Sequence, residues 1–331
     1  MMPKKSPANS FLRTTSIILA IGFIGCGNQA ASTSFTQTTT IVDENLPRVV
    51  ATTSVLCDLT RQVAENTINL DCLVPAGTDP YIYQPRPDDR QVIEQANLIL
   101  YSGYNLEPEL TKIIQETQTS APKIAVAQLA VPQPQQFQTS GQKLTNPYIW
   151  HDAKNTIRMV EVISNNLEKL EPDSAAIYSN NAKEINNQLT QLDSWIKSRI
   201  ATIPSNQRKL VTTSNVLGYY ATAYEIPLAG GLNLINGEEK PTDASVNNWV
   251  KGIQQAQVPT IFAETTINPQ LIQPAATEAN VRVSGRKLYT HDLGELGSEA
   301  DTYQKMMRAN TRTIVEGLGG TYLMFAPTVP Q

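Results

Sequence analysis

A long apolar stripe in the middle of the chain limits the folds that it can adopt. Between positions 172 and 204, apolar residues recur every three or four positions, at Ile185, Leu189, Leu192, Ile196 and Ile200. This spacing predicts one amphipathic helix of about 30 residues, more than twice the average helix length. Such a helix between two regions of alternating strands and helices indicates a strut that joins two lobes. An αα-hairpin is the alternative.

Strand and helix patterns alternate on both sides of this stretch. Short β-branched or apolar runs predict strands at 48–54, 68–74, 97–103, 122–127, 209–214, 226–231, 258–264 and 280–294, the last being one bent strand or two short segments. Helical spacing follows most of these runs, and a closing helix is predicted over 301–320. We therefore predict an α/β fold with two lobes, each a mostly parallel sheet flanked by helices, joined by the long helix. A length of 331 residues suits two lobes.

The first residues indicate a targeting segment. Lys4, Lys5 and Arg13 give a positive start, and the apolar run at 17–24 is shorter than the roughly 20 residues that span a bilayer. A small residue directly before Cys26 resembles a bacterial lipobox, in which a lipid is attached to the cysteine after cleavage. An ordinary signal peptide with an incidental cysteine is the alternative.

The chain accordingly divides into five parts. We expect a signal peptide with lipobox at 1–25 and a flexible polar tether at 26–45. An N-terminal lobe at 46–171, a linking helix at 172–204 and a C-terminal lobe at 205–331 follow. A lipid anchor would hold the folded body at the outer face of the cytoplasmic membrane, facing the periplasm or the exterior. The net charge of −4 does not favour a nucleic-acid partner.

Two cysteines remain in the body of the protein. An oxidising compartment permits a disulfide between Cys57 and Cys72, and its short loop would stabilise the fold by about 3 kcal/mol. Two buried free thiols are the alternative, and the sequence does not decide between them.

Recognisable catalytic motifs are absent from the sequence. There is no phosphate-binding loop, no nucleophile elbow and no His-Glu-x-x-His motif, so we expect a protein that is not an enzyme. The chain has two histidines, His151 and His291, each followed by an aspartate. A His-Asp pair could be a metal ligand with its carboxylate neighbour, but adjacent side chains usually point apart, so we interpret these pairs as surface polar residues.

The loops that follow the strands together resemble a known family. The stretches that carry the resemblance are "LVPAGTDPYIYQPRPDD", "NPYIWHDAKN", "LVTTSNVLGYY", "INGEEKPTDASVNNWV" and "GRKLYTHDLGELG". In this order they are similar to the metal-binding receptors, or solute-binding lipoproteins, of bacterial ABC importers for zinc and manganese. The resemblance covers roughly residues 46–328. It implies a monomer with one metal ion in the cleft between its lobes, and an ABC permease with its ATPase as partners.

The four ligand positions implied by this resemblance are all substituted. They fall on Tyr81, Tyr148, Ser214 and His291, where manganese-type members have two histidines, a glutamate and an aspartate. Because a phenol keeps its proton near neutral pH, we expect weak or no binding of Mn²⁺ or Zn²⁺ by these four side chains.

Three interpretations stay open. In the first, the receptor binds manganese or zinc with help from acids such as Asp152, Glu238, Glu239 or Asp292. In the second, the tyrosines and the histidine are retuned to ferric iron, which is acidic enough to deprotonate phenols. In the third, the protein is a divergent paralogue that binds no ion and acts as an interaction protein or binds a small organic ligand.

Overall fold

The computed structural model describes residues 45–139, 142–232, 242–266, 268, 270 and 272–328. All of them belong to one compact unit, Val42–Gln331. The predicted signal peptide, Cys26, nearly all of the tether, Glu238 and Glu239 lie outside the described residues.

The N-terminal lobe is built on a parallel four-stranded sheet with strand order β2-β1-β3-β4. These strands are β1 (Arg48–Ala51), β2 (Asn69–Cys72), β3 (Leu98–Tyr101) and β4 (Lys123–Ala125). Its helices are α1 (Ser54–Ala64), α2 (Pro87–Glu94), α3 (Pro108–Glu116) and α4 (Val126–Ala130). Thr53 caps α1 by accepting a hydrogen bond from the backbone of Leu56, so the chain turns into this helix directly after β1.

The C-terminal lobe repeats the same strand order in two strands of five residues and two strands of two residues. It contains β7 (Leu210–Ser214), β8 (Leu228–Leu232), β9 (Thr260–Ile261) and β10 (Arg282–Val283) with the helices α7 (Gly218–Ala223), α8 (Asp243–Ala256) and α9 (Ile272–Ala279). β7 pairs with β8 and β9 with β10, while a bridge from Thr212 to Phe262 joins β7 to the end of β9. The order is therefore β8-β7-β9-β10, and all pairings are parallel.

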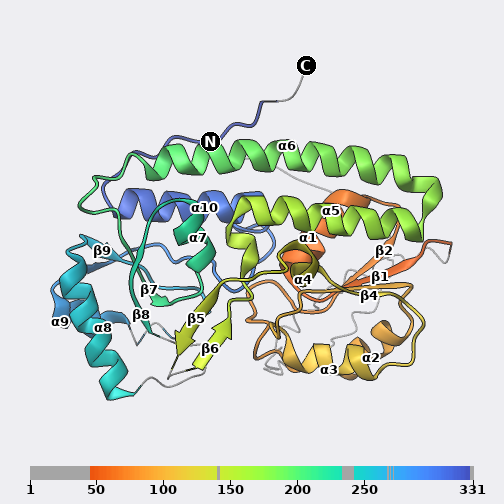
Figure 1. Cartoon of the computed structure of the whole chain (residues 1–331), viewed down its shortest axis with the longest axis horizontal. Coiled ribbons are helices and arrows are strands. Elements are labelled where there is room, and N and C mark those ends of the chain that lie inside the picture. Colours follow the sequence, from red (N-terminus) through yellow and green to blue (C-terminus); the bar gives the residue numbers. More distant parts are fainter. Residues whose placement is uncertain are drawn as a thin grey trace, which may run out of the picture. The chain divides into compact units, whose positions relative to one another are not determined.

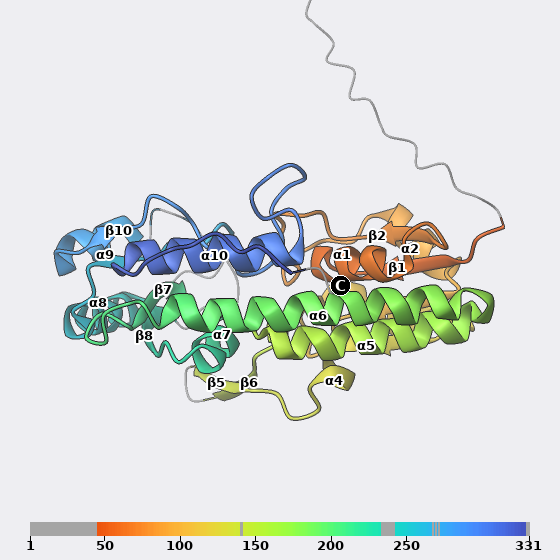
Figure 2. The same cartoon turned by 90° about the horizontal axis from the view of Figure 1, so that it is seen from above.

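Three long helices cover one side of the molecule: the longest runs along both lobes, and each of the other two lies beside it on one lobe (Figures 1 and 2). They are α5 (Ala153–Leu170), α6 (Ala175–Ile200) and α10 (Tyr303–Gly317). The predicted long helix is confirmed as α6, whose 26 residues follow a short 3₁₀ turn at Pro172–Ser174. Because α6 also packs closely against α5, the strut is at the same time one arm of an αα-hairpin. The predicted α/β fold is confirmed, and the domain boundaries stay a prediction.

An antiparallel hairpin between the lobes was not expected from the sequence. It consists of β5 (Gln136–Thr139) and β6 (Gln142–Thr145). The segment 136–145 contains only one phenylalanine and one leucine among polar residues. It lacks the apolar alternation by which a strand can be recognised.

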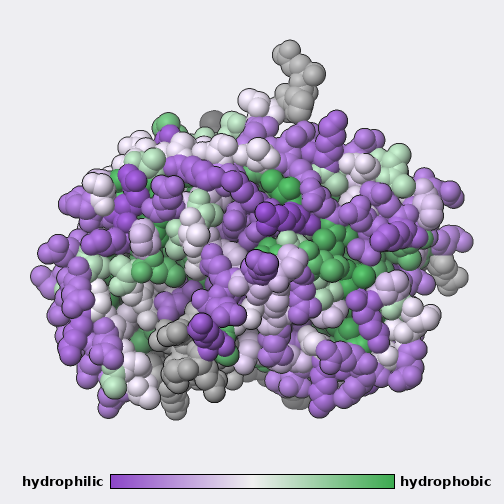
Figure 3. Space-filling view, in the orientation of Figure 1, coloured by the Kyte–Doolittle hydropathy of each residue, from purple (hydrophilic) through white to green (hydrophobic). Residues whose placement is uncertain are grey.

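No helix among the described residues is long and apolar enough to cross a bilayer. The face of the molecule in Figure 3 is covered mainly by hydrophilic residues, with hydrophobic patches between them. Such scattered patches are normal on a folded protein.

Cys57 and Cys72 form a disulfide with a Cα–Cα distance of 5.7 Å. Cys57 is buried in α1, and Cys72 ends β2 at the edge of the N-terminal sheet. The bridge therefore fastens α1 to the edge strand of the sheet, and the alternative of two free thiols is wrong.

The double variant Cys57→Ala/Cys72→Ala should lower the free energy of unfolding by about 3 kcal/mol, because the unfolded chain is no longer cross-linked. Urea denaturation of both proteins measures this loss. Reductant should produce a similar loss in the wild type and none in the variant. A loss below about 1 kcal/mol would contradict a stabilising role of the bridge.

Glu107 joins the ends of two strands in the N-terminal lobe. Its carboxylate accepts hydrogen bonds from the Thr52 hydroxyl at 2.7 Å and from the backbone N–H of Ser102 at 2.6 Å. The second carboxylate oxygen has no partner among the described residues. Because the side chain is fully buried, desolvation raises the pKa of Glu107 to about 7.

The raised pKa of Glu107 predicts that stability falls as the pH rises from 4.5 to 7. In that window the folded protein holds a proton on Glu107 that the unfolded chain has released. Across the whole window, this difference lowers the free energy of unfolding by about 3 kcal/mol. Glu107→Gln should remove this contribution, so its unfolding free energy should decline less than that of the wild type across the window. Exposed Glu109→Gln on α3 is the matched control, and equal pH profiles of all three proteins would refute the prediction.

Candidate functional site

The carboxyl ends of both sheets meet at the lobe junction, where the segment 290–293 is held by the N-terminal lobe. Gly77, which turns the chain after β2 with a φ of +81°, donates its backbone N–H to the last carbonyl of the segment at 2.9 Å. The Ser54 hydroxyl donates to the carboxylate of Asp292 and accepts the last backbone N–H of the segment at 3.0 Å. These hydrogen bonds hold the two lobes together.

His151 supplies a further hydrogen bond between the lobes. Its Nε2 lies 2.7 Å from the carbonyl of Thr290. Burial lowers the pKa of His151 to about 4, so the ring is neutral at neutral pH and its Nε2–H donates to the carbonyl. Both histidines of the chain are fully buried, so the interpretation of them as surface residues is wrong. The two His-Asp sequences gave no sign that the histidines are buried, because their burial depends on contacts between segments that are distant in the chain.

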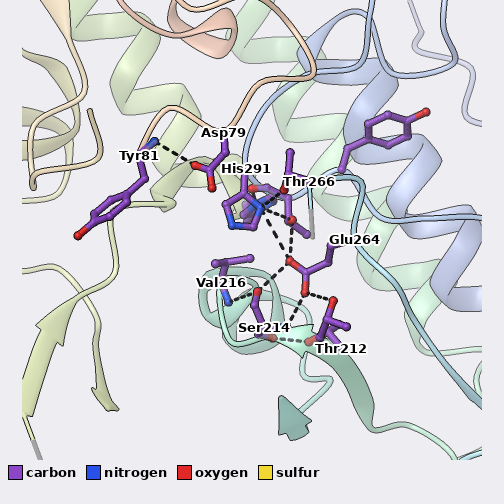
Figure 4. A network of polar contacts seen from close by, with 12 residues as sticks. Asp79, Tyr81, Thr212, Ser214, Val216, Glu264, Thr266 and His291 are labelled. Carbon is purple, nitrogen blue, oxygen red and sulfur yellow. Dashed lines mark hydrogen bonds and ion pairs between the residues drawn. The ribbon is translucent and has the colours of Figure 1, made fainter. Parts of the chain in front are cut away.

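Glu264 organises the C-terminal side of the junction (Figure 4). It is completely buried just after β9 and accepts four hydrogen bonds. The donors are the Thr213 hydroxyl (2.9 Å), the backbone N–H and hydroxyl of Ser214 (2.6 and 2.8 Å) and the Thr290 hydroxyl (2.8 Å). Sequence reasoning missed Glu264, although a carboxylate at the end of an apolar strand is a usable signal.

Three of the four expected ligand positions meet around this network. The Ser214 hydroxyl donates to Glu264, and Nδ1 of His291 lies 2.7 Å from the Thr266 hydroxyl and 2.9 Å from that of Thr290. The Tyr148 ring packs edge-on against His291 with 5.2 Å between the centroids. Nε2 of His291 is buried and has no partner among the described residues.

Tyr148 is held in its neutral form. Its side chain is buried, and desolvation raises the pKa of the phenol well above 10, with further contributions from the charges of Asp79 and Glu264. A protonated phenol is a poor ligand for Mn²⁺ or Zn²⁺.

The fourth position, Tyr81, is not brought into this network. Its backbone N–H donates to Asp79 at 3.0 Å, but its half-buried ring points away from His291 (Figure 4). The loop at 77–89 thus directs this side chain outward. As metal ligands, the four residues stay a prediction.

Two of the expected auxiliary acids are among the described residues, and one of them, Asp292, lies at the junction. Burial raises its pKa well above the usual value, and the charge of Asp79 adds to the shift. Asp152 instead caps α5 by accepting a hydrogen bond from the backbone of Lys154 at 2.9 Å. Within the parts of the chain that the structure describes, no group of three or more His, Cys, Asp and Glu side chains is placed to hold a metal ion.

Replacing Glu264 tests how far the junction depends on it. Glu264→Ala leaves the backbone N–H of Ser214 and three hydroxyls without their acceptor, so the free energy of unfolding should fall by at least about 3 kcal/mol. Chemical denaturation measures the loss, with exposed Glu278→Ala as the matched control. The control should change stability by less than about 0.5 kcal/mol, and an equally small loss for Glu264→Ala would contradict the central role of this carboxylate.

Comparison with known proteins identifies the family. The model of the family described as zinc-uptake complex component A, periplasmic, matches residues 49–317. The chain belongs to this family. The resemblance inferred from the strand-end loops is therefore confirmed over most of the body, including every loop that builds the lobe junction.

Individual members and solved structures agree with this assignment. The chain is 30% identical over 302 residues to the manganese-binding lipoprotein MntA of Halalkalibacterium halodurans, covering 91% of this chain and 96% of that relative. It is 29% identical over 310 residues to the manganese ABC transporter substrate-binding lipoprotein scaA of Streptococcus gordonii, covering 91% and 97%. Its fold matches the periplasmic zinc binding protein TroA from Treponema pallidum with a TM-score of 0.76 and 25% identity, over 82% of this chain and 99% of TroA.

Proposed function

We propose that this protein is the extracytoplasmic substrate-binding component of an ABC importer for transition-metal ions. The observation that carries the proposal is the match to MntA, which extends over 91% of the chain and 96% of the relative. The two-lobe fold with its polar junction supports it. The role is one of binding and delivery, without a chemical step.

The same relatives support a location and partners. MntA and scaA are lipoproteins by name, and scaA is named as an ABC transporter component. We infer that a lipid on Cys26 anchors the protein at the outer face of the cytoplasmic membrane. There it acts as a monomer and passes its cargo to a permease that is driven by a cytoplasmic ATPase.

The cargo does not bind through the family's four ligand positions as a bare ion. The Ser214 hydroxyl is bonded to Glu264, Tyr148 is a neutral phenol and the Tyr81 ring points outward. His291 alone offers a nitrogen, and one nitrogen does not hold Mn²⁺ or Zn²⁺ against water. No comparison favours a paralogue that has given up transport. The importer role therefore does not depend on metal binding by these four residues.

Uptake measurements test the role directly. A strain that lacks the protein should accumulate less of at least one of radioactive manganese, zinc or iron at low external concentration, and the full chain should restore uptake. Cys26→Ala should move the protein from the membrane fraction to the soluble fraction without altering its melting temperature. Unchanged uptake of all three metals in the deletion strain would refute the importer role.

A further inference from the structure

A pocket opens beside the lobe junction, on the side to which Tyr81 points. Its volume is about 490 Å³, and Tyr81 and Tyr148 both line it. Two of the substituted ligand positions therefore contribute to the wall of a cavity. This volume exceeds the need of a single ion and lies within the range typical of small-molecule sites, about 300–1,000 Å³.

The wall of this pocket suits an anionic organic molecule better than a bare cation. Tyr104 joins Tyr81 and Tyr148 to give three aromatic rings, and the side chain of Lys143 on β6 adds a positive charge. No carboxylate is found among the described residues that line the pocket. A hard divalent cation needs such oxygen ligands, whereas aromatic faces and a lysine accommodate a planar anion.

The backbone on one side of the pocket is held in an unusual conformation. Gly103, Tyr104 and Asn105 follow β3 with φ angles of +84°, +54° and +58°, so three successive residues are left-handed. This conformation is costly for a tyrosine and occurs where the surrounding structure imposes it, often at binding sites. The Tyr104 hydroxyl donates to the carbonyl of Val131 at 2.5 Å, which fixes the ring in the wall.

We propose that this pocket binds a transition metal that arrives already coordinated by a small anionic oxygen chelator. This inference rests on the proposed importer function and names the form of its cargo. A receptor whose own ligands are replaced can still deliver metal when the chelator supplies the donor atoms. The partly exposed rings of Tyr81 and Tyr104 then pack against the chelator, and Lys143 pairs with its negative charge.

The inference is tested by isothermal titration calorimetry on the purified mature protein. The probes are ferric citrate, the ferric complex of 2,3-dihydroxybenzoate, each chelator without metal, and free Mn²⁺ and Zn²⁺. We expect at least one ferric complex to bind at least about tenfold more tightly than its metal-free chelator and than either free ion. The proposal is overturned if a free ion or a metal-free chelator binds as tightly as the complexes, or if neither complex binds.

Variants locate the site of binding. Lys143→Gln and Tyr81→Ala should each weaken binding of the complex about tenfold, because they remove the charge and one stacking face. Lys112→Gln on the exposed side of α3 is the matched control for charge and should leave affinity unchanged. Equal affinities for Lys143→Gln and the control would place binding elsewhere and overturn the proposal. Metal uptake in the deletion strain is measured separately. A negative binding result would therefore refute the chelate proposal without refuting the importer role.

Discussion

The lobe junction depends on a small set of buried hydrogen bonds around the segment 290–293. Buried backbone groups must find partners, and here the partners come from the opposite lobe: Gly77, Ser54 and His151. Because these residues follow β1, β2 and the hairpin, their positions depend on the whole N-terminal sheet. The contact is polar and directional, so it sets the register of one lobe against the other in a way that apolar packing alone does not.

Glu264 performs the corresponding task within the C-terminal lobe, and Glu107 performs it in the N-terminal lobe. Each is buried, and each carboxylate accepts a backbone N–H and a hydroxyl near the ends of neighbouring strands. They differ in how many donors they meet. Four hydrogen bonds satisfy Glu264, whereas Glu107 meets two and retains an oxygen without a partner among the described residues. Desolvation by burial raises the pKa of Glu107 to about 7.

The residues at three of the four expected ligand positions fit this network structurally. Ser214 adds a donor to Glu264, His291 accepts or donates through Nδ1 with two threonines, and Tyr148 packs against His291. At these expected ligand positions, the side chains are engaged with one another and with Glu264. The exception is Tyr81, which points away from His291 and lines the neighbouring pocket.

The sequence by itself determined the α/β class, the long helix and the family, because these depend on periodicity and on loop motifs that are local in the chain. It did not reveal the β5–β6 hairpin, whose residues carry little apolar signal, or the burial of both histidines. It also left the state of Cys57 and Cys72 open. Only the tertiary structure decided these points, and it alone showed that Ser214 faces Glu264 while Tyr81 faces outward. The physical reason is that burial, side-chain direction and pKa arise from contacts between residues far apart in the chain, such as Ser54 and Asp292, which local patterns do not encode.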